Sequence, residues 1–149
     1  MPNNKRWGVL YCPKHELLSP KRRWEKIEKC LKDNGVEYDF IQSESSSGVD
    51  RLIKMMINNG YETIVIVGGD SALNDAVNCL MQYDSSVRER VVLGVIPNGL
   101  MNDFAHFWGF RESDYSQTIK WLKQRHVRKI DLGCIRYTNK KGETCRRYF

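Results

Sequence analysis

Thr63-Ile-Val-Ile-Val-Gly-Gly-Asp-Ser-Ala72 is the stretch that decides the fold class. Its first five residues form a continuous β-branched run, which is typical of a strand buried on both faces of a parallel sheet. Two adjacent glycines then leave the backbone without side-chain bulk, and a helical apolar pattern follows. A strand, a glycine turn and a helix in this order predict one unit of an α/β domain.

The sequence on both sides repeats this alternation. Further strands are expected at residues 7–11, 36–41 and 91–96. Helices are expected from Ser19-Pro20 to Gly35, from Val49 to Asn59, after Asp70, over 103–108 and over 113–125. Ser47 and Asp50 form a weak acidic capping box for the second of these. The inner face of the third is expected to consist of Leu73, Val77, Leu80 and Met81. The alternation predicts a three-layer α/β/α domain over residues 1–128 with a mainly parallel sheet.

The C-terminal segment changes character. Apolar and polar residues alternate over 130–135, residues 139–142 have the composition of a turn, and residues 144–149 have the pattern of another strand. This predicts an antiparallel hairpin rather than another strand–helix unit. Because the last strand stops on Tyr148-Phe149 without a closing turn, we expect residues 129–149 to be crossing strands that lead into a missing, β-rich second domain.

Charge and cysteine content narrow the functional classes. Residues 120–149 hold ten Lys and Arg against two acidic side chains, whereas the first 119 residues hold fourteen basic and sixteen acidic groups. A basic stretch of this kind suits an anionic membrane or an acidic partner. It lacks the interleaved aromatic residues of single-strand binders, so nucleic-acid binding is not expected. Five cysteines without a Cys-x-x-Cys pair predict a reduced, cytoplasmic setting and no structural zinc.

Two loops carry the candidate chemistry. Gly68-Gly69-Asp70-Ser71 follows one buried strand, and residues 97–103, Pro-Asn-Gly-Leu-Met-Asn-Asp, follow the next. Ligands of open parallel sheets gather beyond the carboxyl ends of the strands, and the N–H groups that begin the next helix suit phosphate. Both loops therefore indicate a nucleotide site at one edge of the sheet.

The structural alternative is a pair of capped turns. In that interpretation Asp70 caps its own helix, and Asn102 or Asp103 caps the next. The aromatic residues that follow would then belong to the core: Phe104, Phe107 and Trp108.

Together the two loops resemble the diacylglycerol kinase-like lipid kinases, whose pattern is G-G-D-G-T-L-N-E followed by P-x-G-T-x-N-D-F-A. The matching segments here are residues 68–75, Gly-Gly-Asp-Ser-Ala-Leu-Asn-Asp, and residues 97–105, Pro-Asn-Gly-Leu-Met-Asn-Asp-Phe-Ala. Asp131-Leu132-Gly133 is similar to the D-L-G at the start of that family's crossing strands. The resemblance extends over nearly the whole chain.

The resemblance implies an ATP-dependent kinase that phosphorylates a lipid hydroxyl, such as that of diacylglycerol, with Mg²⁺ present. ATP would bind between the α/β domain and the chain's own second domain, and the catalytic base would lie beyond Phe149. The lipid substrate would be met at the inner membrane surface, and a homodimer is a further expectation. The implied nucleotide-binding residues are Gly68, Gly69, Asp70, Ser71, Asn74, Asn98, Gly99, Asn102 and Asp103.

The chain departs from the family pattern where phosphate would bind. Ser71 replaces a third glycine, and Ala72 and Leu100 replace threonines. Asp75 replaces glutamate, and the first loop reads Cys-Pro-Lys-His-Glu at residues 12–16 instead of N-P-x-S-G. Each lost hydroxyl removes a hydrogen bond worth about 1.5–3 kcal/mol if charge-assisted. Two alternatives stay open: a catalytically inactive relative with a binding or regulatory role, and an NAD kinase-like enzyme, whose family shares G-G-D-G-T.

Overall fold

The computed structural model describes residues 6–13, 20–44 and 48–149. It is built on a four-stranded sheet in the order β2-β1-β3-β4, in which every neighbouring pair is parallel. The strands are β1 (Trp7–Tyr11), β2 (Tyr38–Gln42), β3 (Thr63–Gly68) and β4 (Val92–Pro97). The expected parallel sheet is confirmed, and each strand lies within two residues of its expected bounds.

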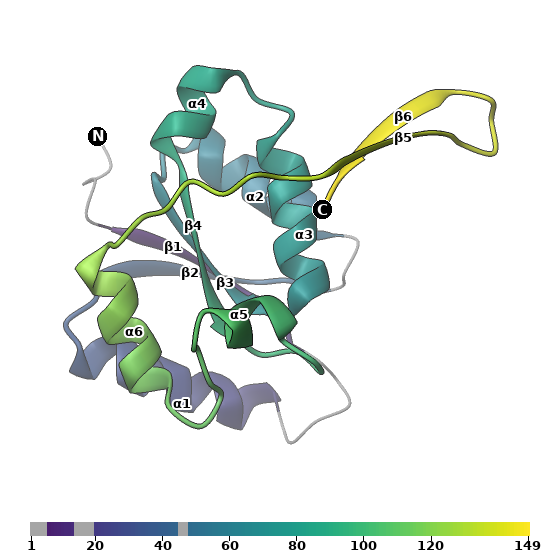
Figure 1. Cartoon of the computed structure of the whole chain (residues 1–149). Helices are drawn as coiled ribbons and strands as arrows, with labels where there is room; N and C mark the ends of the chain where they lie inside the picture. The colour runs from purple at the N-terminus through teal and green to yellow at the C-terminus, as the bar shows by residue number, and fades with distance from the viewer. Residues whose placement is uncertain (1–5, 14–19, 45–47) are drawn as a thin grey trace.

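Helices cover both faces of this sheet (Figure 1). α1 (Pro20–Asp33) and α6 (Tyr115–Gln124) pack on one face, and α2 (Val49–Asn58) and α3 (Asp70–Leu80) pack on the other. The short helix α5 (Asp103–Phe107) contacts β4 and α3. The predicted three-layer arrangement is therefore confirmed. Of the helices in the described ranges, none is long and apolar enough to cross a membrane.

The side chains of β3 alternate between two buried clusters. Ile64 and Ile66 pack with α2 and α3, whereas Val65 and Val67 pack with α1 and α6. All four are at most 1% exposed. The continuous apolar run that decided the fold class thus results from helices on both faces of one strand.

Two helical details differ from the sequence-based expectation. α4 (Ser85–Arg90) was not predicted, because it buries no residue and so has no apolar periodicity. Its start is nevertheless marked by Asp84, whose Oδ1 accepts the Val87 N–H at 3.1 Å. The expected inner face of α3 is confirmed at Leu73 and Leu80 but wrong at Val77 and Met81, because the helix also turns small side chains toward α2 and the sheet. Its buried residues are Ala72, Leu73, Ala76 and Cys79.

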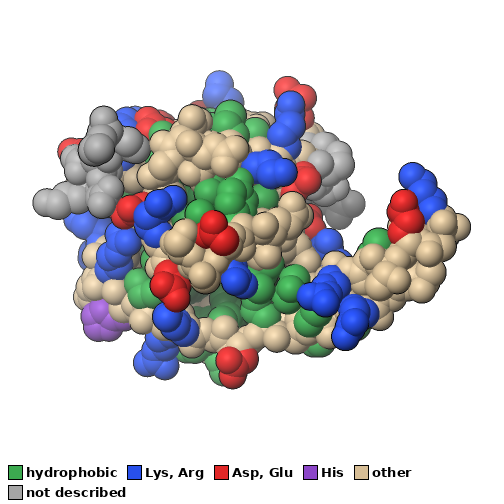
Figure 2. Space-filling view, turned by 90° about the horizontal axis from the view of Figure 1, so that it is seen from above, with side chains coloured by type: hydrophobic (Ala, Val, Ile, Leu, Met, Phe, Trp, Pro, Cys, Tyr) green, Lys and Arg blue, Asp and Glu red, His purple; other side chains and the backbone are tan. Residues whose placement is uncertain are grey.

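The C-terminal hairpin is confirmed and consists of β5 (Cys134–Thr138) and β6 (Thr144–Tyr148). β5 begins four residues later than the alternation suggested and is exposed along its whole length. Figure 2 shows the hairpin projecting from the body with Lys and Arg side chains along it. Its base is attached to α3, where Asn78 accepts the Tyr148 N–H and donates to the Tyr148 carbonyl, both at 2.9 Å.

Three sequence-based expectations fall outside the described residues. They concern the helix cap Ser19, the capping-box residue Ser47 and the first-loop residues 14–16. The helices that Ser19 and Ser47 were expected to cap, α1 and α2, begin at Pro20 and Val49 as the sequence suggested.

Candidate functional site

The two glycine loops meet at the C-terminal edge of the sheet. β3 and β4 end level with each other, since Gly68 pairs with Pro97 in the strand register. The Asn98 N–H then donates to the Gly68 carbonyl at 2.9 Å and extends this pairing by one residue. The structure therefore places the loop after β3 beside the loop after β4, as the sequence suggested.

Gly69 and Gly99 pack backbone against backbone. A Cβ added at Gly99 would lie 2.4 Å from Gly69 Cα and 2.7 Å from Asn102 Oδ1. A Cβ added at Gly69 would lie 2.9 Å from Gly99 Cα. Neither position has room for a side chain. Part of the bare backbone that the sequence suggested for ligand approach is thus used for the contact between the loops.

Asp70 caps a helix, but not its own. Its Oδ2 accepts the Asp103 N–H at 2.9 Å and its Oδ1 accepts the Phe104 N–H at 3.0 Å. These two N–H groups begin α5, whose cap-position residue Asn102 makes no side-chain cap bond. The expectations that Asp70 caps α3 and that Asn102 or Asp103 caps α5 are therefore wrong, because the contact between the loops brings the start of α5 against the Asp70 carboxylate.

The first turn of α3 consequently lacks a side-chain cap. Its cap position is Gly69, which has no side chain, and no cap bond is made there. The first intrahelical bond runs from the Leu73 N–H to the Gly69 carbonyl at 3.1 Å. The amides of residues 70–72 therefore have no intrahelical partner, and they lie at the positive end of the helix dipole. This arrangement suits an anion.

Asn102 is folded into its own loop. It is 2% exposed and has a left-handed backbone with φ of 53°, which asparagine tolerates better than most residues. Its Oδ1 accepts the Gly99 N–H at 2.7 Å, and its Nδ2 donates to the Gly99 carbonyl at 3.0 Å. Asn102 thus holds the loop in shape, whereas the side chain of the neighbouring Asp103 is an exposed carboxylate.

Glu112 supports Asn102 from the far end of α5. Its carboxylate accepts from Asn102 Nδ2 and from His106 Nε2, the latter at 2.9 Å. Burial acts to raise the pKa of Glu112, but the hydrogen bonds from His106, from its own backbone N–H and from Asn102, together with the charge of His106, outweigh it and the pKa is lowered. Glu112 could not be predicted as a site residue, because nothing in the local sequence pattern places it beside a residue ten positions earlier.

Asn98 faces the opposite side of the sheet edge. It is 1% exposed; its Oδ1 accepts from Arg23 Nη1 at 2.9 Å, and its Nδ2 donates to the Cys12 carbonyl at 3.5 Å. Arg23 was also missed, because it lies within a run of basic residues that gives no reason to prefer one of them.

Burial, followed by the nearby Asp75 carboxylate, raises the pKa of Cys12 to about 12. This thiol is therefore protonated and unreactive at neutral pH.

Asn74 and Ser71 lie further from the contact between the loops. Asn74 Nδ2 donates to the Tyr148 carbonyl at 3.0 Å, and its Oδ1 accepts from Arg147 at 3.0 Å. Arg147 also pairs with Asp75 at 2.7 Å. Asn74 therefore belongs to the attachment of the hairpin on α3. Ser71 is exposed in the first turn of the same helix.

Phe104 and Phe107 of α5 are not core, contrary to the structural alternative, and Trp108, which follows α5, is half-buried and belongs to neither core cluster. Phe107 is 79% exposed and Phe104 is 37% exposed. In the loop before them, Leu100 and Met101 are 59% and 67% exposed. The buried residue of α5 is Ala105, because a helix of five residues turns only one narrow side toward β4.

Comparison with known proteins agrees with this geometry. The diacylglycerol kinase catalytic domain family matches residues 6–135. Diacylglycerol kinases of Staphylococcus carnosus (strain TM300) and Bacillus subtilis (strain 168) are 25% identical over 129 residues and 26% identical over 131. These matches cover 87% and 88% of this chain but 40% and 42% of the relatives.

A solved structure shows the same fold. A crystal structure described as a diacylglycerol kinase from Bacillus anthracis str. Sterne gives a TM-score of 0.72 at 18% identity, over 94% of this chain and 45% of that one. The chain spans less than half the length of these relatives. The match over residues 6–135 shows that the chain belongs to the diacylglycerol kinase catalytic domain family.

Proposed function

We propose that this chain is the nucleotide-binding part of an ATP-dependent lipid kinase that phosphorylates a lipid hydroxyl such as that of diacylglycerol. Membership of the family supports this reaction class. The observation that carries the proposal is the first turn of α3, whose amides at residues 70–72 have no cap because Asp70 is bonded to α5. Free amides at the end of a parallel strand suit the phosphates of a nucleotide.

The described residues also fit a nucleotide that arrives with Mg²⁺. Within the part of the chain that the structure describes, no group of three His, Cys, Asp or Glu could hold a metal ion. Mg²⁺ in kinases takes most of its ligands from substrate phosphates and water, with one or two carboxylates from the protein. The exposed Asp103, beside the Asp70 carboxylate, could supply such a ligand. The ion would neutralise charge on the transferred phosphoryl group.

A second candidate function is nucleotide binding without catalysis. It is favoured by Ala72, which is 9% exposed and has no hydroxyl, and by Leu100, which is 59% exposed in place of the family's threonine. Phosphoryl transfer depends on positioning, so two missing hydrogen bonds would reduce turnover more than binding. Transfer of labelled phosphate from ATP to diacylglycerol vesicles by the full protein separates the two candidates, because only the kinase yields labelled lipid.

Calorimetric titration of the chain with Mg-ATP tests the nucleotide site. We expect saturable binding, and we expect Ser71→Asp to weaken it by about tenfold because a carboxylate would occupy the positive end of α3. Ser85→Asp is the matched control, since Ser85 is an exposed serine in the first turn of α4. No binding by the wild-type chain up to millimolar Mg-ATP would overturn the proposal. Equal affinities of Ser71→Asp and Ser85→Asp for Mg-ATP would show that the start of α3 does not bind the phosphates.

A further inference from the structure

Arg23 differs from the two lysines of α1 that form ion pairs, Lys29 and Lys32. Lys32, for example, is exposed and pairs with Glu28 one turn away at 3.1 Å. Arg23 is half-buried, and no carboxylate of the described residues lies within ion-pairing distance of it. Its bond from Nη1 goes to the neutral amide of Asn98 at 2.9 Å. A half-desolvated guanidinium thus has no described counter-charge.

The contact with Asn98 fixes the Arg23 side chain. Asn98 is 1% exposed and is itself bonded to the backbone at Cys12 and Gly68. A buried amide held at both ends is a rigid acceptor, so the position of the guanidinium is set by the ends of β1, β3 and β4. The other N–H groups of Arg23 donate to no described residue. A guanidinium has five such donors, and their planar arrangement suits oxyanions.

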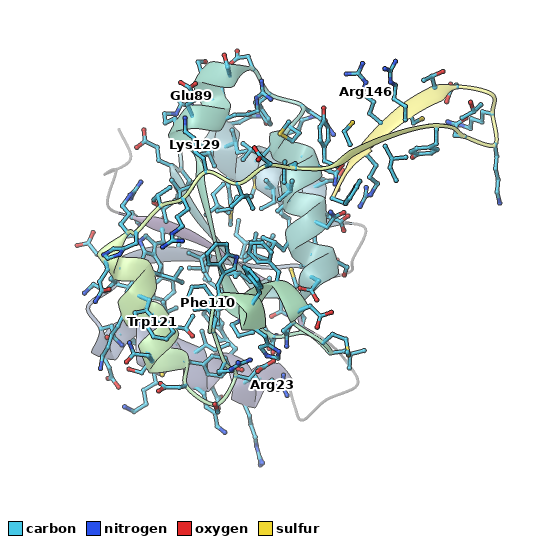
Figure 3. All side chains as sticks on the ribbon, in the orientation of Figure 1. Arg23, Glu89, Phe110, Trp121, Lys129 and Arg146 are labelled. Carbon is cyan, nitrogen blue, oxygen red and sulfur yellow. The ribbon has the colours of Figure 1, made fainter. Side chains whose placement is uncertain are left out.

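Arg23 also lies where the strand order of the sheet reverses. From β1 the chain continues to β2 on one side, whereas β3 and β4 lie on the other. Ligands of open α/β sheets bind beyond the carboxyl ends of the strands at this reversal. Asn98 bridges that place, because its N–H bonds to Gly68 at the end of β3 and its side chain bonds to Cys12 after β1. Figure 3 labels Arg23 where α1 passes below α5 in the view.

We infer that Arg23 binds the phosphate chain of the nucleotide. The inference deepens the proposed function and rests on it, because it adds a cation from α1, on one face of the sheet, to the free amides of α3, on the other. The shared chemistry is that of a polyphosphate, which either a nucleotide or a free inorganic polyphosphate can supply. Loss of one charge-assisted contact of this kind weakens binding by about tenfold to a hundredfold.

Calorimetry with three probes tests this role: Mg-ATP, inorganic tripolyphosphate and adenosine. We expect Arg23→Ala to weaken the binding of both polyphosphates by at least about tenfold and to leave any affinity for adenosine unchanged. Arg23→Gln is expected to weaken them similarly, although its amide can still donate to Asn98, because the positive charge is lost. Arg22→Ala is the matched control, since Arg22 is the exposed neighbour on the same helix.

The outcomes separate the inference from the proposed function. If the wild-type chain binds tripolyphosphate through Arg23 but does not bind Mg-ATP, Arg23 is a ligand of free polyphosphate, and the nucleotide proposal fails together with the nucleotide part of the inference. If Mg-ATP binds the wild type, Arg23→Ala and Arg23→Gln equally, the inference is overturned and the proposed function stands. If neither polyphosphate binds up to millimolar concentration, both are overturned. Thermal unfolding establishes that each variant is folded. If Arg23→Ala is not folded, the affinities of Arg23→Gln decide the test.

Discussion

The loops after β3 and β4 look alike in sequence but play different parts in the structure. Each follows a buried strand, contains glycine and ends in a helix. The loop after β4 is closed on itself, because Asn102 bonds to Gly99 and the start of α5 is capped. The loop after β3 supplies that cap through Asp70 and leaves α3 without one. The same motif therefore forms a loop after β4 whose polar groups bond to one another, and a loop after β3 that leaves the first amides of α3 uncapped.

Crowding between Gly69 and Gly99 offers the most severe way to break this pair. We expect Gly99→Ala to lower the free energy of unfolding by about 3 kcal/mol, because its Cβ would lie 2.4 Å from Gly69 Cα. Gly69→Ala should cost less, about 1–2 kcal/mol, since its nearest atom would be 2.9 Å away. Urea denaturation of the variants measures both values.

Gly142→Ala is the control for glycine replacement alone. Gly142 has φ of 79° and nothing within 4 Å of an added Cβ, so strain in the backbone is its only cost, about 1 kcal/mol. If Gly99→Ala destabilises no more than this control, the two loops do not pack as described.

Removing the shared cap should have the next largest effect. We expect Asp70→Ala to cost about 1–2 kcal/mol, because the Asp103 and Phe104 amides lose their acceptor. Hydrogen exchange should then speed up at those two amides, which belong to α5. The control Asp84→Ala removes a cap that acts within α4 and should leave both amides protected. Faster exchange at the start of α3 with no change in α5 would contradict the account.

A smaller effect should appear as pH dependence at Glu112. Because hydrogen bonds lower its folded pKa below the ordinary value of 4.5, its contribution to stability is present above that value and is lost as pH falls through the folded pKa. We expect the wild type to be more stable than Glu112→Gln at pH 6 and this difference to shrink as the pH is lowered below about 4.5. A difference that stays constant from pH 6 to pH 3 would show that the carboxylate does not support Asn102.

The fold could be predicted from the sequence because its signals are local. The β-branched run of β3 predicts burial on both faces of the strand, and Pro20 predicts the start of α1. The failures occurred where the local signal was weak. α4 buries nothing, and α3 turns Ala72 and Ala76 inward beside the expected Leu73 while Val77 stays outside the core.

The site could be predicted only in part, because a motif does not state the partner of each side chain. Sequence spacing placed Asp70 and Asn102 at helix starts, but the acceptors of α5 depend on the contact between two loops about thirty residues apart in the chain. Arg23 and Asn98 are seventy-five positions apart, so their bond could not be read from any window of sequence. Long-range contacts of this kind become visible only in the folded chain.

Hydrogen exchange with and without Mg-ATP tests the central claim most directly, namely that the start of α3 and not that of α5 receives phosphate. Saturating Mg-ATP should slow exchange at the amides of Ser71 and Ala72, which have no hydrogen-bond partner among the described residues. The amides of Asp103 and Phe104 should show unchanged protection, because Asp70 already holds them. Protection gained at Asp103 and Phe104 with none at Ser71 and Ala72 would contradict the account.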